Sequence, residues 1–562
     1  MKESILGKIQ EALQSLQKEG SLAGFSLPEV MVERPKDEAF GECTSNIALV
    51  SAKAAQKSPM EIAELLRAKL TDPAFEKVEV AAPGYLNFFL APPYFADVLE
   101  KSLAGVVIEA ETREKVMVEY SQPNTHKEFH IGHLRNVFIG STLVNVLRRV
   151  GHETLGVNYI GDTGSHIAKC LWGIVTLHAN EDLDAVANKP EFLGKAYAEA
   201  VQAIEGSEEN EAAFKALQNR FEAGDPELVA LWEKTRQWSL DEFDRLYGEL
   251  GVTFDEVFYE SVEEQVGKAL LPELLEKGVI KESEGAIVAD LEDVNLGILV
   301  LVRRDGSALY GLKDIPLAKK KFEQYGIDRS IYVVDIRQSL YFKQLFEILR
   351  RFGFHKRMQH AAYEFVSLKG GESMSSRKGN IIAAQELIDT VTANVKAAFP
   401  ENPDPLAIAL GAIRFAMLRQ GSTSKIEFDI EESVRLDGAT GPYVQYAHAR
   451  IASILRKAEE SALAWDGPVE PWDFHDKEKE LIREISRFPE LLIEVSETNE
   501  VHKIAHFALT LAEKFHSFYA QCQVIDAADA DLSQKRLQLS AAVQKTLKET
   551  LDLLGIAAPE KM

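Results

Sequence analysis

Apolar residues at the start of the chain recur at the spacing of an amphipathic helix. They share one helical face at Ile5, Ile9, Leu13 and Leu16. Acidic side chains already occur in the first turns, which is not typical of a secretory signal. A second helix is expected near 59–70, and short strands are expected within 77–90. Together these elements predict an N-terminal α/β domain over residues 1–110.

The pattern that follows is typical of a nucleotide-binding sheet. Residues 115–120 (KVMVEY) alternate as a strand, and a loop containing proline and asparagine follows. A helix is predicted over 132–150, and the next strand over 154–160. Strand, loop, helix and strand in this order are expected of a parallel α/β sheet. The apolar run IYVVD at 331–335 predicts a further strand of the same sheet. A Rossmann-type parallel-sheet domain is therefore predicted over residues 111–399.

Charge divides this central region. Residues 180–280 read as mainly helical, and extended segments are expected near 286–290 and 298–303. Residues 180–300 carry 10 basic and 29 acidic side chains, a net charge of −19. The flanking segments 113–179 and 301–399 are net basic, at +2 and +7. We therefore expect a functional domain with a solvated insertion at about 180–300. After a proline-rich linker, residues 400–562 have helical periodicity and predict an all-α C-terminal domain.

Overall composition narrows the class of protein. The chain has 562 residues, 46% of them hydrophobic and 27% charged, with a formal net charge of −25. This is the composition of a multidomain globular protein. No apolar run approaches the roughly 18 residues that a membrane-spanning helix needs, so no membrane partner is expected. Cys43, Cys170 and Cys522 are far apart and form no CxxC pair, which argues against a disulfide scaffold or a cysteine zinc site. A cytoplasmic location is expected.

The candidate chemistry lies in His130-Ile131-Gly132-His133, where the first loop of the sheet meets its helix. A helix N-terminus presents unpaired amides and a positive dipole to phosphate oxygens. Gly132 would let a nucleotide lie close to the backbone, and the two imidazoles could donate to charge that develops on a phosphate. Lys127 and Arg135 are expected to add positive charge around the same place.

Two other interpretations of these histidines remain open. His126, His130 and His133 could be zinc ligands, although no HExxH pattern accompanies them. They could also be capping or core histidines. The position of the motif between a strand and a helix favours phosphate chemistry.

These blocks resemble a known family. The HIGH motif after a first strand is the hallmark of class I aminoacyl-tRNA synthetases, and its surroundings, VEYSQPNTHKEFHIGHLRNVFIG, are similar to arginyl-tRNA synthetases. Further blocks resemble that family in its own order, namely GVNYIGDTGSH (156–166), LVRRDGSALYGLKDI (301–315), YVVDIRQSLYFKQLF (332–346), MSSRKGN (374–380) and GATGPYVQYAHARIASILRK (438–457). The resemblance covers essentially the whole chain and implies an enzyme that joins arginine to its tRNA through arginyl-adenylate, releasing AMP and pyrophosphate.

An arginine site must hold a planar guanidinium, which calls for paired carboxylates. Glu119 and Asp314 are candidates from the two halves of the sheet domain, although either could be an ordinary surface or capping acid. The resemblance implies that Tyr310 joins them around the guanidinium. It also implies that Asn124 and Gln338 bind the amino and carboxyl groups of the amino acid, with His130 nearby.

ATP is expected as a substrate, bound with Mg²⁺, and no dedicated protein metal site is expected. The resemblance implies an ATP site made of His130, Gly132, His133, Gly161, Asp162, Met374 and Ser375. The catalytic loop of class I enzymes, KMSKS, corresponds here to SMSSR, with Ser373 and Ser376 at the lysine positions. In this family a lysine just before HIGH, here Lys127, can supply the missing charge. Arg377 and Lys378 are further candidates, and a solvated basic loop is the alternative.

The flanking domains are expected to bind tRNA. The resemblance implies that residues 1–110 contact the tRNA elbow and that residues 400–562 bind the anticodon. Candidates for base contact are Tyr443, Gln445, Tyr446 and Arg450, although the tyrosines could equally pack inside a helical bundle. The resemblance also implies a monomer whose activation of arginine requires bound tRNA.

Two rival functions remain. The first is a class I synthetase for another amino acid, against which the acidic pair Glu119 and Asp314 argues. The second is a tRNA-binding paralogue without activity. The intact His130, Gly132 and His133 argue against such a paralogue, and the serine-substituted loop is the feature in its favour.

Overall fold

The computed structural model describes residues 2–26, 32–35, 37–369 and 382–562. The chain folds into two compact units. The first comprises Met1–Val106, Ile451–Phe488 and Glu513–Thr546, and the second comprises Val107–Arg450, Pro489–Ala512 and Leu547–Met562. No helix in the described ranges is both long enough and apolar enough to cross a membrane.

The first unit contains a four-stranded antiparallel sheet in the order β1-β2-β4-β3. Its strands are β1 (Val32–Glu33), β2 (Cys43–Ser45), β3 (Phe75–Ala81) and β4 (Tyr85–Leu90), and its helices include α1 (Lys2–Lys18), α2 (Ile47–Ala55), α3 (Pro59–Lys69), α4 (Pro92–Ala104) and α17 (Asp476–Ile485). The predicted face of α1 is buried, because Ile5, Ile9, Leu13 and Leu16 are each at most 3% exposed. The α/β character predicted for the beginning of the chain is therefore confirmed.

A five-stranded parallel sheet forms the centre of the second unit, in the order β12-β11-β5-β6-β7. Its strands are β5 (Lys115–Glu119), β6 (Glu153–Ile160), β7 (Glu256–Tyr259), β11 (Arg329–Asp335) and β12 (Arg357–Tyr363). The crossover helix α5 (Ile131–Arg149) joins β5 to β6. This helix can lie close to Tyr120 because Gly140 has no side chain. A Cβ added to Gly140 would lie 2.2 Å from the Tyr120 ring. This confirms the predicted Rossmann-type parallel sheet.

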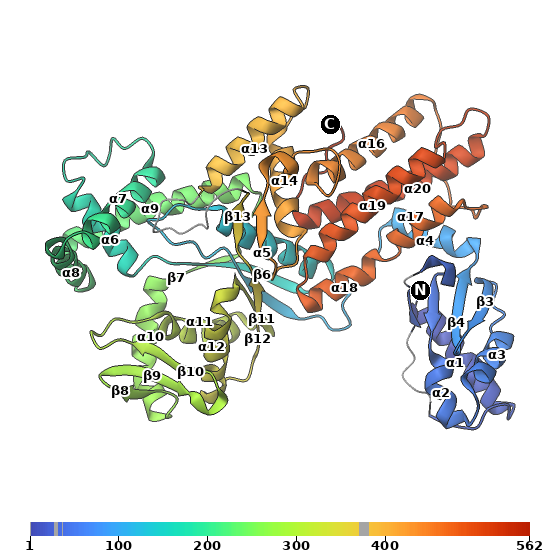
Figure 1. The fold of residues 1–562 in the computed structure, drawn as a ribbon, viewed down its shortest axis with the longest axis horizontal. Helices are drawn as coiled ribbons and strands as arrows, with labels where there is room; N and C mark the ends of the chain where they lie inside the picture. The colour runs from blue at the N-terminus through green and yellow to red at the C-terminus, as the bar shows by residue number, and fades with distance from the viewer. Residues whose placement is uncertain (1, 27–31, 36, 370–381) are drawn as a thin grey trace. The chain divides into compact units, whose positions relative to one another are not determined.

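The predicted insertion has two parts, and its second part includes the extended segments predicted near 286–290 and 298–303 (Figure 1). The first is a helical group that shares an apolar core, made of α6 (Ser165–Thr176), α7 (Lys189–Glu205), α8 (Glu208–Glu222) and α9 (Pro226–Glu249). The second part consists of α10 (Glu260–Glu276) and an antiparallel sheet of β8 (Lys281–Ser283), β9 (Ala286–Leu291) and β10 (Gly297–Val302). Between them, β7 returns to the parallel sheet; at four residues it is too short to be distinguished by periodicity.

Two further helices cover the strands that follow the insertion. They are α11 (Tyr310–Tyr325), before β11, and α12 (Ser339–Arg351), between β11 and β12. Leu312, Ile315 and Ala318 of α11 pack with Leu345 and Ile348 of α12 in one buried cluster. This packing fixes α11 beside the ends of the parallel strands.

The last part of the chain is mainly helical, as predicted. Its helices are α13 (Ala384–Ala398), α14 (Pro405–Leu418), α15 (Ile430–Ser433), α16 (Gly441–Glu460), α18 (Phe488–Thr498), α19 (His502–Gln521) and α20 (Ala530–Leu554). One strand was not predicted: β14 (Ile426–Phe428) pairs in parallel with β13 (Val366–Leu368). Three residues carry too little alternation to reveal a strand. The predicted domain boundaries remain predictions.

Candidate functional site

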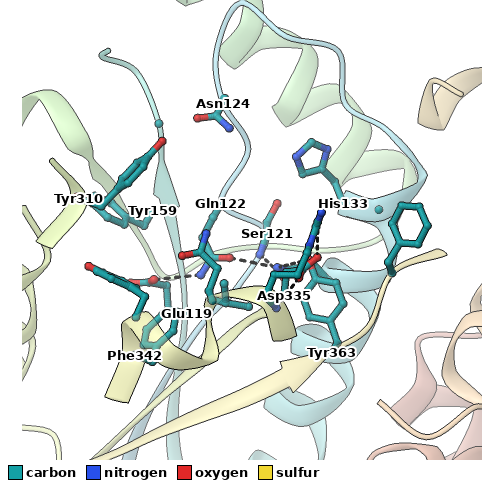
Figure 2. Close-up of a pocket in the computed structure, with 18 of the residues that line it drawn as sticks. Glu119, Ser121, Gln122, Asn124, His133, Tyr159, Tyr310, Asp335, Phe342 and Tyr363 are labelled. Atoms are coloured by element: carbon teal, nitrogen blue, oxygen red, sulfur yellow. Dashed lines mark hydrogen bonds and ion pairs between the residues drawn. The ribbon is translucent and has the colours of Figure 1, made fainter. Parts of the chain in front are cut away.

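A cavity of about 640 Å³ opens where β5, β6 and β11 end (Figure 2). Its lining includes Glu119, Ser121, Gln122, Asn124, His130, Gly132, His133, Asn136, Tyr159, Gly161, Glu260, Tyr310, Asp314, Val334, Asp335, Arg337, Gln338, Tyr341, Phe342, Tyr363, Phe365 and Val366. The carboxyl ends of strands are where open parallel sheets bind ligands. The cavity brings together most of the predicted site residues that lie in the described ranges.

His130 and His133 define the N-terminus of α5. Nδ1 of His130 accepts the backbone N–H of Gly132 at 3.1 Å, and Nδ1 of His133 accepts the backbone N–H of His130 at 3.1 Å. An Nδ1 that accepts a hydrogen bond carries no proton, so each neutral ring has its N–H at Nε2. The rings stack with centroids 3.8 Å apart. The capping interpretation is thus correct for both histidines, and it leaves each ring one donor.

Both imidazoles are neutral near pH 7. Burial lowers the pKa of His130 to about 4, and the charge of Lys127 adds to this effect. Burial also lowers the pKa of His133 well below its usual value, again with a contribution from Lys127. The pair therefore offers hydrogen-bond donors without a full positive charge.

The loop after β5 lies against the end of β6. Asn124 and Gly161 form a parallel bridge, and a Cβ added to Gly161 would lie 2.3 Å from Oδ1 of Asn124. Gly161 is therefore needed for the close approach of the Asn124 side chain, which Figure 2 shows beside the cavity. Gln338, at the end of the turn after β11, lines the same cavity.

Two carboxylates lie in the cavity wall. Glu119 ends β5, where its Oε1 accepts a hydrogen bond from Nε2 of Gln122 at 3.0 Å and its Oε2 is paired with Nζ of Lys321. Asp314 lies just after the first turn of α11 and accepts a hydrogen bond from the hydroxyl of Tyr341. The site thus contains the paired acids that the sequence predicted.

The Asp314 carboxyl titrates near neutrality. Burial raises its pKa to about 7; the Tyr341 hydrogen bond opposes this rise, and the charges of Glu119 and Glu260 add to it. Tyr310, at the beginning of the same helix, is 56% exposed and borders the cavity. An exposed phenol ring next to buried carboxylates can pack against a planar cation.

The structure corrects the predictions for Arg135 and Asp162. Arg135 is fully buried and donates to the carbonyl oxygens of Ser424 at 2.9 Å and Gly421 at 3.1 Å. It therefore connects α5 to the segment before β14 and does not add positive charge to the cavity. Asp162 is also fully buried, with Oδ2 paired to Nε of Arg236 at 2.8 Å. The predicted contact of Asp162 with ATP does not fit this position, because its carboxylate is engaged inside the protein.

Lys127 lines a second cavity, of about 500 Å³, with its Nζ 5.2 Å from the centroid of the Tyr197 ring. His126, one of the three possible zinc ligands, is fully buried and its ring nitrogens lie 3.1 Å from Thr125 Oγ1 and 2.7 Å from Thr235 Oγ1. Within the described ranges, no three His, Cys, Asp or Glu side chains are grouped so as to hold a metal ion.

Some predicted residues lie elsewhere. Met374, Ser375, Ser376, Arg377 and Lys378 are outside the described residues. On α16, Tyr443, Tyr446 and Arg450 are half-buried. Gln445 is fully buried and donates to the carbonyl oxygen of Ala557 at 2.9 Å, which corrects the prediction that it contacts tRNA.

Sequence reasoning missed several residues of the site. Gln122, Tyr159, Glu260, Asp335, Arg337 and Tyr341 line the cavity, and Lys321 lies behind it against Glu119. Asp335 ends a predicted strand and Arg337 follows it, so their place at its carboxyl end could have indicated that they belong to the site. Lys321 gave no signal, because it is the third of three consecutive lysines.

Three family models match the chain. The model described as "tRNA synthetases class I (R), catalytic domain" matches residues 96–429. "Arginyl tRNA synthetase N terminal domain" matches residues 3–90, and "DALR anticodon binding domain" matches residues 444–562. The three matches together span nearly the entire sequence.

Named relatives are similar over their full length. The chain is 36% identical to an arginine–tRNA ligase of Bdellovibrio bacteriovorus, over 95% of this chain and 94% of the relative. It is 35% identical to an arginine–tRNA ligase of Streptococcus pneumoniae, over 100% of both chains. Among solved structures, arginyl-tRNA synthetase of Thermus thermophilus superposes with a TM-score of 0.80 at 27% identity over 100% of both chains. The fold is also similar to that of the Plasmodium falciparum arginyl-tRNA synthetase, with a TM-score of 0.79 at 22% identity, covering 100% of this chain and 99% of that one.

Proposed function

The chain belongs to the arginyl-tRNA synthetase family, and from that premise we infer that it is an arginine–tRNA ligase. It activates arginine with ATP to arginyl-adenylate and transfers the arginyl group to the terminal ribose of the arginine tRNA. Pyrophosphate and AMP are the other products.

A single observation supports this assignment most strongly. One cavity holds both the neutral donors at the N-terminus of α5, His130 and His133, and the carboxylates Glu119 and Asp314. The donors suit a phosphate, and the carboxylates suit a guanidinium. Amino-acid activation requires these two ligands side by side.

The acidic pair is proposed to select arginine. The guanidinium, which has donors and no acceptor, would donate to both Glu119 and Asp314, with the Tyr310 ring against its face. Asn124 and Gln338 would then hold the amino and carboxyl groups of the amino acid. A shorter or uncharged side chain would not supply the positive charge and paired donors that the two carboxylates would otherwise receive from the guanidinium, at a cost in a buried site.

Activation is proposed to proceed by direct displacement. The arginine carboxylate attacks the α-phosphate of ATP, and the bond to pyrophosphate breaks. The Nε2–H groups of His130 and His133 would donate to the phosphate oxygens as charge shifts toward the leaving group. In the second step a hydroxyl of the terminal ribose attacks the activated carbonyl, and AMP leaves. No side-chain nucleophile takes part, so positioning and electrostatics carry the catalysis.

The positive charge for the leaving group is proposed to come from Lys127. Its ammonium is near the α5 N-terminus, since it contributes to the lowered pKa of both His130 and His133. Mg²⁺ is proposed to arrive with the ATP phosphates, whose oxygens are its preferred ligands. Met374, Ser375, Ser376, Arg377 and Lys378 remain proposed contacts of the ATP loop.

The flanking domains are proposed to bind the tRNA. Residues 1–110 would contact its elbow and residues 400–562 its anticodon, with Tyr443, Tyr446 and Arg450 as candidate base contacts. We further propose a cytoplasmic monomer whose activation of arginine depends on bound tRNA.

Pyrophosphate exchange tests the function. The enzyme should exchange pyrophosphate into ATP with arginine in the presence of arginine tRNA. Absence of exchange with and without tRNA would favour an inactive paralogue, and equal exchange with lysine would favour a synthetase of another specificity. Either result would overturn the assignment.

A further inference from the structure

Lys321 is a fully buried lysine that points at the specificity pocket from behind. Its side chain is 0% exposed, and its Nζ forms an ion pair with Oε2 of Glu119. The same Nζ lies 4.3 Å from the centroid of the Tyr332 ring. A buried ammonium is costly unless it is paired, so its partners on β5 and β11 determine where this side chain lies.

We propose that Lys321 is a positioning residue for arginine: it fixes the carboxylate of Glu119 and limits the pocket to one net negative charge, which matches one guanidinium. This inference rests on the proposed function, because it deepens the account of how that function selects its substrate. Lys321 acts through Glu119, since it lies behind the cavity wall and Glu119 lies within it.

The geometry of Glu119 supports the positioning role. Its two oxygens are held from different sides, Oε1 by Nε2 of Gln122 at 3.0 Å and Oε2 by Lys321. Gln122 is itself held, because its Oε1 accepts a hydrogen bond from Nδ2 of Asn136 at 3.1 Å. Each carboxylate oxygen can accept more than one hydrogen bond, so both remain able to bind a guanidinium. The carboxylate is therefore oriented before arginine arrives.

The charges around the pocket fall into three groups, of which Asp335 and Arg337 form one balanced pair at 2.7 Å. Glu260 and Glu264 both pair with Lys313 at 3.1 Å, and Lys268 pairs with Glu264 at 2.7 Å, so this group is balanced. The remaining group consists of Glu119, Asp314 and Lys321, two carboxylates with one ammonium. The neutral phenols facing this group belong to Tyr159, Tyr310, Tyr332 and Tyr341.

Removal of the ammonium would leave two neighbouring carboxylates uncompensated. Two like charges in a buried site cannot both ionise easily, so one carboxyl takes up a proton. Asp314 is the one expected to do so, because its pKa already lies near neutrality and the Lys321 charge helps to keep it down. A protonated Asp314 attracts a guanidinium less strongly, and the loss grows as the pH falls.

The full-length enzyme provides the test, through kinetics of arginine tRNA charging. Lys321→Met should raise the KM for arginine about tenfold or more while the KM for ATP stays within about twofold. The KM for arginine should also rise more steeply below pH 8 than in the unaltered enzyme. Lys321→Arg should restore the KM for arginine, because it keeps the charge.

Lys320→Met is the matched control. Lys320 precedes Lys321 in α11, and its Nζ pairs at 2.7 Å with Glu263, another buried carboxylate. Among the described residues, Glu263 is not part of the cavity lining. This variant should leave the KM for arginine unchanged. If Lys321→Met does not fold, Lys321→Gln carries the same test, since it keeps a donor for Glu119 and removes the charge.

Three outcomes would overturn the proposal. They are an unchanged KM for arginine in the neutral variants, equal rises in the KM values for arginine and ATP, and the same defect in Lys320→Met. Each of these requires that the unaltered enzyme charges tRNA with arginine. Failure of that charging would instead contradict the proposed function.

Discussion

Nδ1 of His133 accepts the backbone N–H of His130 at 3.1 Å, so the second histidine of the HIGH motif caps the helix that the first one begins. The interaction fixes the tautomer of His133 and leaves its N–H at Nε2. Because burial keeps both rings neutral, these donors would act in the proposed mechanism as dipoles toward a developing phosphate charge.

His133→Ala should therefore impair activation more than substrate binding. Removal of one preorganised donor typically costs about 10²–10³-fold in rate. We expect a loss of this size in kcat for arginine-dependent, tRNA-dependent pyrophosphate exchange, with a much smaller change in the KM for arginine. His355→Ala, at an exposed position before β12, is the control and should retain full activity. A loss of less than threefold in His133→Ala would show that this donor has no part in the chemistry.

Arginine binding should depend on pH through Asp314. The pKa of this carboxyl is about 7, so the group is ionised above that pH and protonated below it. If the ionised form binds the guanidinium, as proposed, kcat/KM for arginine should fall as the pH drops through 7, approaching tenfold per pH unit. Steady-state charging between pH 6 and 8.5 measures this dependence. In Asp314→Asn, kcat/KM should be low throughout and should lack the inflection; an inflection that persists would assign it to another group.

Lys127→Ala tests whether Lys127 supplies the positive charge that is missing where Ser373 and Ser376 occupy the lysine positions of the KMSKS loop. If Lys127 stabilises the departing pyrophosphate, the variant should lose about tenfold or more in the rate of adenylate formation at saturating ATP. Lys195→Ala, at an exposed position in the insertion, should behave like the unaltered enzyme. An unchanged rate of adenylate formation in Lys127→Ala would exclude Lys127 from this role.

The sequence predicted those parts of the fold and site that depend on neighbouring residues. The alternation of β5, the helix after it and the HIGH motif are local patterns, and the structure places His130, Gly132 and His133 where they were expected. Glu119 was predictable because it ends a strand of a parallel sheet, where ligands bind.

Long-range pairing explains what the sequence did not reveal. Lys321 meets Glu119 across 202 positions, and only the packing of α11 against the sheet brings them together. Asp162 lies in a motif typical of a site, yet its pairing with Arg236, 74 positions away, buries it. Gln445 is likewise buried by its bond to Ala557, 112 positions away. Local periodicity contains no information about such partners.

Charging of arginine tRNA with arginine, lysine and citrulline tests the central claim most directly. Citrulline has nearly the shape of arginine but carries an uncharged urea group in place of the guanidinium, and lysine carries the charge without the planar group. If the cavity of Glu119 and Asp314 selects a guanidinium, the enzyme should charge the tRNA with arginine at least about 10³-fold more efficiently, in kcat/KM, than with either analogue. Charging with citrulline or lysine at a rate comparable to that with arginine would contradict it.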